Sequence, residues 1–296
     1  MLDKYSRIDF RDQIARNKRN SFFLVTIIFF VLILLGYIIS MAFEPGYFFV
    51  IMVFAIIFSI SYILISYYNS DKISVASVRA KKASREKYKS YYDSVEGLTL
   101  ASGLPMPKLY IMDSEQINAF ASGRDPQHAV ICVTKGALEK LNKNEFEAVV
   151  AHELGHIGNY DIRYMTLVAV MVGMVAIISE IFLRSLWFRS SGRNNKGKAI
   201  FILIGIMLAI LAPIAVYFVQ KSISRKREYT ADASSVKFTR YPGSLISALK
   251  KIKKQNIFSE KKVSKAIAPL FFANPFKGLS KTHPPIEKRI QALEKM

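Results

Sequence analysis

Two long apolar stretches near the start of the chain place the strongest limit on its fold. Residues 22–43 contain only Thr26 and Ser40 as polar interruptions, and residues 47–68 form a second stretch of similar length. At about 1.5 Å per residue, a helix of either stretch would cross a hydrocarbon core of roughly 30 Å. The turn residues Glu44–Gly46 separate them. The sequence therefore predicts a transmembrane helical hairpin and not a cleaved signal peptide, whose apolar region would be shorter.

The composition agrees with a membrane protein. Hydrophobic residues make up 51% of the chain, and 42 Lys+Arg against 22 Asp+Glu give a net charge of +20. In a membrane protein this charge indicates contact with anionic lipid, and no basic and aromatic residues interleave as in a nucleic-acid-binding module. Cys132 is the single cysteine, which excludes an intramolecular disulfide and a zinc site with several cysteines. We expect the lipid bilayer as a partner and no nucleic acid.

The charges that flank the hairpin predict its orientation. Basic residues precede the first stretch and follow the second, and Glu44 is the only charged residue between them. By the positive-inside rule, both flanks lie in the cytoplasm.

Residues 165–183 and 199–219 are two further candidate spans, although the first contains Glu180 and the second Pro213. The loop between them carries basic residues and no acidic ones, so a position on the far side would contradict the charge rule. Either the first hairpin dominates the topology and this pair crosses, or the pair enters the membrane in part or packs as a buried hairpin. We expect it to cross.

The stretch VVAHELGHIGNYD, residues 149–161, places two histidines four positions apart with a glutamate beside the first. If it is helical, His152 and His156 project from one face and can bind one ion. Glu153 then lies where its carboxylate reaches the open coordination position of the metal, which is the H-E-x-x-H arrangement of zinc peptidases. The motif predicts one zinc ion per chain, with Glu153 as the catalytic base.

The helix that carries this motif is predicted to run from Asn142 to Asn159. Asn144 is the expected N-cap because Glu147 follows it by three residues, and Gly158 with Asn159 supplies the stop signal.

A third zinc ligand should come from another element. The segment 222–238 has helical character and places Glu228 and Asp232 on one face. Glu228 is the candidate ligand, and Asp232 would accept the free N–H of a liganding histidine. The alternative is an exposed, salt-bridged helix, because basic residues directly precede Glu228, and the segment alone favours that alternative.

Four motifs in this order resemble a known family. They are NAFASG at 118–123, HELGH at 152–156, SRKREYTADA at 224–233 and THPPIEKRIQAL at 282–293, with two apolar segments before the catalytic region and two between the motifs. The chain is similar to the membrane-integrated M48 metallopeptidases of the bacterial heat-shock type. In that family the glutamate of the E-x-x-A-D pattern is the third zinc ligand, which falls on Glu228.

The resemblance also implies a gluzincin fold, a place in the bacterial cytoplasmic (inner) membrane, and cleavage of misfolded or damaged membrane proteins during envelope stress. Three protein ligands would leave one zinc position for water, whose proton Glu153 would take and pass to the leaving amine. Related prenyl-protein proteases have a histidine in a motif similar to that of His283, which we expect to stabilise the oxyanion. The alternative is a loop histidine positioned by the prolines that follow it.

Residues 108–138 indicate strand, loop, strand and helix, with the strands at 108–112 and 129–134. An extended substrate could add along an exposed edge of this small sheet, and Asn118 would lie beside the substrate backbone.

We therefore predict a mainly α-helical membrane protein with a small β-sheet, four transmembrane helices and a cytoplasmic gluzincin-type protease domain. Its parts are a basic segment and hairpin (1–69), the first half of the protease domain (70–164), a second hairpin (165–221) and the C-terminal half (222–296). Expected partners are membrane-protein substrates, with a homo-oligomer or quality-control partners left open. The alternatives are a prenyl-protein or peptide-processing protease and a non-catalytic zinc-containing scaffold, and Glu153 argues against the scaffold.

Overall fold

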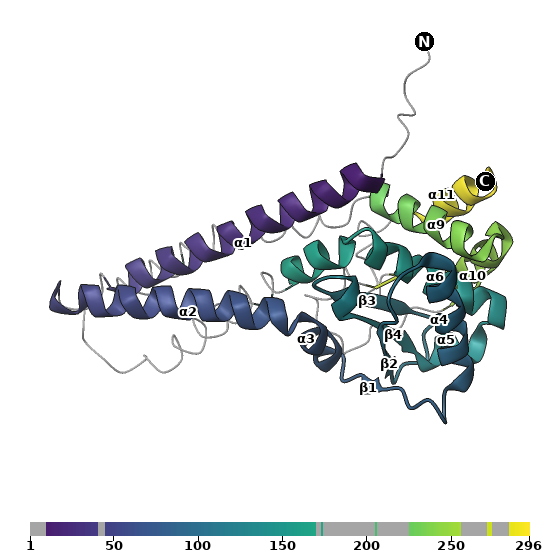
Figure 1. The fold of residues 1–296 in the computed structure, drawn as a ribbon, viewed down its shortest axis with the longest axis horizontal. Helices are drawn as coiled ribbons and strands as arrows, with labels where there is room; N and C mark the ends of the chain where they lie inside the picture. Colours follow the sequence, from purple (N-terminus) through teal and green to yellow (C-terminus); the bar gives the residue numbers. More distant parts are fainter. Residues whose placement is uncertain are drawn as a thin grey trace, which may run out of the picture.

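The computed structural model describes residues 10–40, 45–169, 225–255, 271–273 and 284–296, together with Gly173 and Gly205. Its helices are α1 (Phe10–Ser40), α2 (Phe48–Tyr68), α3 (Ser70–Ser77), α4 (Lys89–Ser102), α5 (Lys135–Lys140), α6 (Lys143–Gly158), α9 (Arg225–Thr239), α10 (Pro242–Lys254) and α11 (Ile286–Leu293). Its strands are β1 (Lys81–Lys82), β2 (Lys108–Met112), β3 (Ala119–Gly123) and β4 (Ala129–Thr134). Figure 1 shows α1 and α2 projecting as a pair from a globular part that holds the sheet and the other labelled helices.

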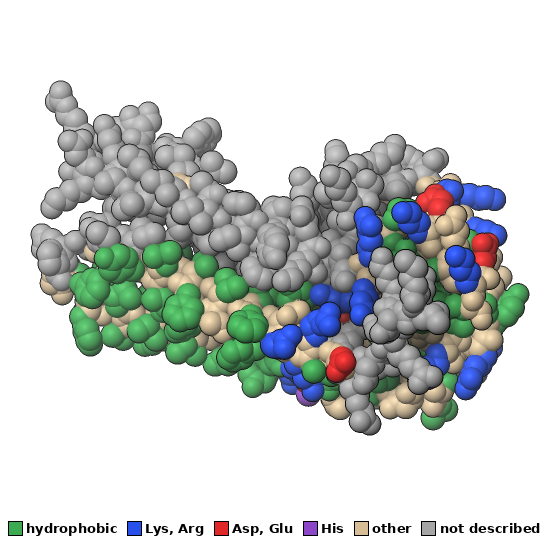
Figure 2. All heavy atoms as spheres, turned by 90° about the horizontal axis from the view of Figure 1, so that it is seen from above, with side chains coloured by type: hydrophobic (Ala, Val, Ile, Leu, Met, Phe, Trp, Pro, Cys, Tyr) green, Lys and Arg blue, Asp and Glu red, His purple; other side chains and the backbone are tan. Residues whose placement is uncertain are grey.

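The expected N-terminal hairpin is present. Within the described residues, the helical segments Ile14–Tyr37 and Phe48–Tyr68 are long and apolar enough to cross a membrane, and only 6% of the second is buried. The two helices approach closely at Gly36, where an added Cβ would collide with the Cβ of Ala55. Apolar side chains cover the visible face of the hairpin, whereas Lys and Arg gather on the globular part (Figure 2). This division is the one expected of a membrane anchor and a water-facing domain.

The second predicted hairpin falls largely outside the described residues. Of residues 165–221, only 165–169, Gly173 and Gly205 are described, and they are helical. The helix of residues 161–169 packs against α1, and the apolar side chains in this contact are Leu24, Ile28, Leu32, Tyr164, Leu167 and Val168. The start of the third apolar stretch therefore lies along the first membrane helix.

The sheet has the strand order β1-β2-β4-β3, with β2 and β4 parallel and the other pairs antiparallel. The predicted strands at 108–112 and 129–134 are confirmed as β2 and β4. The expected loop between them was wrong in part, because Ala119–Gly123 forms the edge strand β3. Alanine, serine and glycine have low β-propensity, and burial of all five residues against the neighbouring elements stabilises this strand instead.

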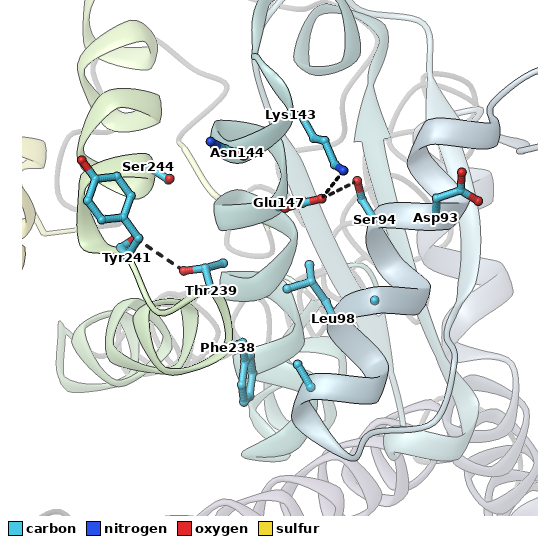
Figure 3. A pocket seen from close by; sticks show the side chains of 12 residues that line it. Asp93, Ser94, Leu98, Lys143, Asn144, Glu147, Phe238, Thr239, Tyr241 and Ser244 are labelled. Atoms are coloured by element: carbon cyan, nitrogen blue, oxygen red, sulfur yellow. Dashed lines mark hydrogen bonds and ion pairs between the residues drawn. The ribbon is translucent and has the colours of Figure 1, made fainter.

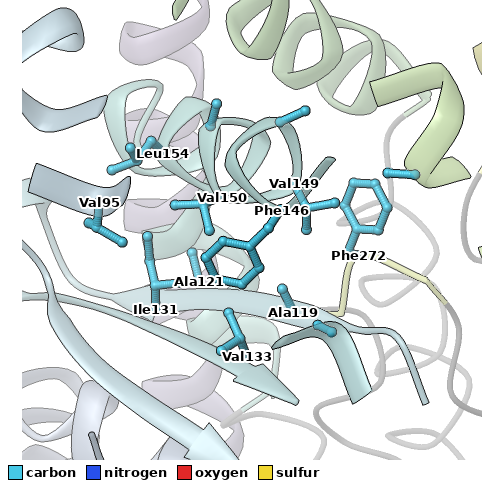
Figure 4. Close-up of a cluster of buried hydrophobic side chains, with 14 of the residues drawn as sticks. Val95, Ala119, Ala121, Ile131, Val133, Phe146, Val149, Val150, Leu154 and Phe272 are labelled. Carbon is cyan, nitrogen blue, oxygen red and sulfur yellow. The ribbon is translucent and has the colours of Figure 1, made fainter. Parts of the chain in front are cut away.

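Helix α6 crosses one face of the sheet and buries its apolar side against it. Figure 4 shows Val149, Val150 and Leu154 of α6 facing Ala121, Ile131 and Val133 of β3 and β4. The N-terminus of α6 differs from the sequence prediction. Its N-cap is Asn142, which forms a capping box with Glu145, and not Asn144 with Glu147.

Helices α6 and α9 pack at very short range because Gly155 has no side chain. A Cβ at this position would lie 2.8 Å from the Cβ of Ser234 and 3.2 Å from the Cα of Ala231. The Ser235 hydroxyl also donates a hydrogen bond of 2.6 Å to the Ala148 carbonyl. This close approach brings the first turn of α9 to the C-terminal half of α6.

Candidate metal centre

Three potential metal ligands from α6 and α9 meet in the interior. His152 and His156 lie one turn apart on α6, and Glu228 lies in the first turn of α9. One ligand atom from each falls within 4.8 Å of the others, and all three residues are buried. The two Nε2 atoms are 3.2 Å apart, and they lie 3.8 Å and 3.7 Å from the carboxylate oxygens of Glu228.

Each histidine has a carboxylate behind it. The Nδ1 of His152 lies 2.9 Å from Asp232 Oδ1, and the Nδ1 of His156 lies 3.0 Å from Asp161 Oδ2. Because an ionised carboxylate only accepts, each Nδ1 carries a proton and donates it to its carboxylate, and each Nε2 is directed at the other ring. Orienting acceptors of this kind are typical of metal-binding histidines.

This donor set fits a divalent cation. Four ligands placed tetrahedrally at 2.0–2.1 Å from zinc are about 3.3–3.4 Å apart, close to the separation of the two nitrogens. Burial lowers the pKa of His152 to about 4, so its ring is neutral at pH 7. Burial also lowers the pKa of His156, but the Asp161 hydrogen bond and the Glu228 charge outweigh it and raise that pKa to about 9. The carboxylates around His156 therefore favour a positive charge on its ring, whereas the surroundings of His152 keep that ring neutral.

Glu153 lies beside the cluster without belonging to it. Its side chain is buried, and neither carboxylate oxygen has a hydrogen-bond partner among the described residues. Burial raises the pKa of Glu153 to about 7, although the charge of His156 and the nearby amide of Ala121 lower it. A carboxylate with such a pKa can exchange a proton at neutral pH.

Comparisons with known proteins identify the family of the chain. The profile of peptidase family M48 matches residues 84–296. The chain belongs to peptidase family M48. A protease HtpX homologue of Dictyoglomus turgidum is 42% identical over 292 residues, covering 97% of this chain and 95% of the relative. A second such homologue, of Listeria monocytogenes, is 38% identical, and the match covers 96% of this chain and 99% of the relative.

Among solved structures, the chain is similar to S. mikatae Ste24p, with a TM-score of 0.50 and 20% identity. The match covers 96% of this chain and 67% of Ste24p, and it shows a shared fold. Together with the two apolar helices, these relationships make the protein a membrane metallopeptidase of family M48.

Asp232, the predicted partner of a liganding histidine, connects the M48 site to α11. Arg289 is fully buried and donates from Nη2 and Nε to the two oxygens of Asp232. Burial raises the pKa of Asp232, but the charge of Arg289 and the bond to His152 outweigh it and hold that pKa below its usual value. The ring of Phe272 packs edge-on against His152, with 4.7 Å between centroids. His152 is therefore held from two sides.

The structure places Asn118 directly before β3, where its buried amide binds the chain itself. Its Nδ2 donates to the Ala273 carbonyl at 2.7 Å, and its Oδ1 accepts from the Ala273 amide at 3.1 Å. Contact with a substrate backbone therefore remains a prediction for this residue. His283 lies outside the described residues.

A separate pocket lies at the other end of α6. Its volume is ≈ 460 Å³, and it is lined by Asp93, Ser94, Gly97, Leu98, Ala101, Lys143, Asn144, Glu147, Phe238, Thr239, Tyr241 and Ser244. Figure 3 shows it between α4, the N-terminal turns of α6, and the junction of α9 and α10. None of its lining residues belongs to the metal centre, so we assign it no part in the chemistry.

The sequence analysis did not assign a role to Asp161. It lies just beyond α6 and is fully buried beside His156. An acidic residue five positions after the second histidine was the available signal. Asp161 reaches His156 only because the chain turns at residues 159 and 160, and the local sequence does not predict the direction of that turn.

Proposed function

We propose that this M48 peptidase is a zinc-dependent endopeptidase that binds one zinc ion through His152, His156 and Glu228. The observation that carries the proposal is the position of Glu153. A buried carboxylate without a hydrogen-bond partner lies next to three convergent ligands, and its raised pKa suits proton transfer. A purely structural zinc site would have no use for such a group.

When bound, zinc supplies Lewis acidity that polarises a peptide carbonyl and lowers the pKa of water. Glu153 takes the proton of the attacking water and transfers it to the leaving amine. Asp232 and Asp161 hold the two histidine rings in the tautomer that presents Nε2, and Arg289 neutralises the buried charge of Asp232. His283 is proposed to donate to the oxyanion.

The substrate is proposed to bind as an extended strand along β3. The carbonyl of Ala119 at the outer edge of β3 accepts a hydrogen bond from Phe272, so the chain itself pairs with the first part of this edge. The Ala121 amide, two residues farther on, is close enough to Glu153 to lower its pKa. A substrate strand that continues along this edge would pass beside the catalytic base. Main-chain pairing of this kind does not depend on the substrate sequence.

The substrates are proposed to be misfolded or damaged membrane proteins, cleaved on the cytoplasmic side of the bacterial inner membrane. The metal centre lies at the base of the hairpin, since the helix that begins at Asp161 packs along α1. The positive-inside rule supports the orientation. Four membrane-spanning helices remain part of this proposal.

The test uses full-length protein in detergent, stripped with a chelator and then given zinc. Wild type should bind one zinc ion and cleave casein and several unrelated unfolded membrane proteins. Glu228→Ala should lose about 10-fold or more in zinc affinity and lose cleavage, whereas the exposed Glu139→Ala should match wild type. Cleavage confined to one site of one substrate would favour the processing protease instead. Zinc binding unchanged in Glu228→Ala would exclude the ligand set.

A further inference from the structure

The polar end of α1 reaches into the metal centre. Asn17 is 2% exposed although it lies near the N-terminal end of this helix. Its Nδ2 donates hydrogen bonds of 2.7 Å to Asp161 Oδ1 and 2.9 Å to the Asn159 carbonyl. One amide therefore binds both the turn that follows α6 and the carboxylate behind His156.

Asp161 connects this contact to the metal ligand. Its Oδ2 lies 3.0 Å from His156 Nδ1, and its Oδ1 accepts from Asn17. Apart from His156, the one basic side chain of the described residues with an ion pair to Asp161 is Arg227, whose Nε lies 3.7 Å from Oδ1. Asn17 thus makes the shortest recorded bond to the oxygen that does not face the histidine, and it limits rotation of the carboxylate.

The rest of α1 holds Asn17 in place. Lys18 lies over the ring of Tyr160, with 4.5 Å from Nζ to the centroid. Farther along α1, Leu24, Ile28 and Leu32 pack against the helix of residues 161–169, which begins at Asp161. The first membrane helix and the helix that begins at Asp161 therefore form one packed unit, and a shift of α1 would move the carboxylate that orients His156.

We propose that Asn17 is a positioning residue for the metal centre and that seating of α1 sets the orientation of His156 through Asp161. The inference rests on the proposed metal site. It assigns the N-terminal membrane helix a part in metal affinity beyond that of an anchor. The carboxylates behind the two histidines are then held differently. Asp232 pairs with Arg289 of the protease domain, whereas Asp161 accepts a 2.7 Å hydrogen bond from Asn17 of the membrane hairpin, with Arg227 3.7 Å away.

The test measures zinc retention and not activity. Full-length protein in detergent carries Glu153→Gln in every sample so that proteolysis does not interfere. Zinc is withdrawn by a competing chelator from the reference protein and from the Asn17→Ala, Asp161→Asn and doubly substituted proteins. Asn20→Ala is the matched control, because Asn20 is the same residue type on the same helix and is half-buried.

We expect Asp161→Asn to weaken zinc binding by about 10- to 100-fold and Asn17→Ala by about 10-fold, with Asn20→Ala unchanged. Because Asn17 acts through Asp161, Asn17→Ala should have little further effect in the Asp161→Asn background. Cobalt substituted for zinc should show shifted visible absorption bands in Asn17→Ala. If Asn17→Ala does not fold, Asn17→Ser retains a short polar side chain and takes its place with the same expected direction.

Two results would overturn the inference. The first is that Asn17→Ala has the same zinc affinity and the same cobalt spectrum as Asn20→Ala. The contact would then be purely structural, even if Asn17→Ala unfolds at a lower temperature. The other is additive losses in the double variant, which would mean that Asn17 acts by another route. A reference protein that binds no zinc would instead refute the proposed function.

Discussion

Arg289 and Asp232 form a buried, two-point ion pair behind His152. The guanidinium donates from Nη2 to Oδ1 at 2.6 Å and from Nε to Oδ2 at 2.9 Å, and both side chains are at most 2% exposed. The same Asp232 Oδ1 lies 2.9 Å from His152 Nδ1. The pair therefore links α11, near the C-terminus, to a candidate metal ligand on α6.

Removal of one partner should be severe. Arg289→Ala leaves the charge of Asp232 buried and unpaired, which costs about 3–5 kcal/mol in the free energy of unfolding. Thermal unfolding in detergent measures the loss. The control is Arg85→Ala, because Arg85 pairs with Glu96 at an exposed site, where such pairs contribute about 0–1 kcal/mol. Equal effects of the two substitutions would contradict the assigned role.

Gly155 controls the distance between α6 and α9. In Gly155→Ala the new Cβ would meet Ser234 and Ala231 of α9, so the helices must separate. We expect a loss of about 1–3 kcal/mol in unfolding free energy and weaker zinc binding, because α9 carries Glu228. Unfolding and chelator competition together measure both effects.

Gly97 is the matched control for this substitution. It lies within α4, and an added Cβ meets nothing within 4 Å. Gly97→Ala should therefore leave zinc binding unchanged and stabilise the protein by about 0.5–1 kcal/mol. Our account of the helix contact fails if Gly155→Ala behaves in the same way.

The N-terminus of α6 should make stability dependent on pH. Burial raises the pKa of Glu145, but hydrogen bonds from Lys251, Ser247 and the Asn142 amide outweigh it and hold that pKa below its usual value. A lowered pKa in the folded state gives stability that is complete above the unfolded pKa of about 4.3 and is lost as pH falls through the folded value.

Glu145→Gln should therefore lower the unfolding temperature at pH 7 and make its fall toward acid shallower than in wild type. A pH series of thermal unfolding curves measures this difference. Glu139→Gln, at an exposed position of α5, is the control and should follow the wild-type curve. Identical acid profiles for Glu145→Gln and wild type would show that Glu145 does not contribute in this way.

Local sequence rules predicted the elements of the site better than its assembly. Two histidines four positions apart share a helix face in any α-helix, so the position of His152 and His156 on one side of α6 followed from spacing alone. Glu228 is different, because its own segment favours an exposed helix, and only the resemblance to the family indicated that it meets the histidines. Asn17 and Asp161 are separated by 144 positions, and no local pattern indicates such a contact.

The two local errors also have physical reasons. Asn142 and Asn144 are each followed by a glutamate three residues later, so both satisfy the capping pattern. In the structure, Ser247 and Lys251 of α10 form hydrogen bonds to Glu145, the partner of Asn142 in the capping box. These are tertiary contacts, which the local sequence does not show. Strand β3 was missed because pairing with β4 and burial stabilise a sequence of low strand propensity.

The most direct test of the central claim compares wild type with Glu153→Gln after removal and return of zinc. The substitution keeps the shape of the side chain and removes its ability to take a proton. We predict that Glu153→Gln binds zinc as tightly as wild type and cleaves casein at least about 100-fold more slowly, since general base catalysis contributes roughly 10²–10⁴-fold. Cleavage by zinc-loaded Glu153→Gln at the wild-type rate would contradict the account.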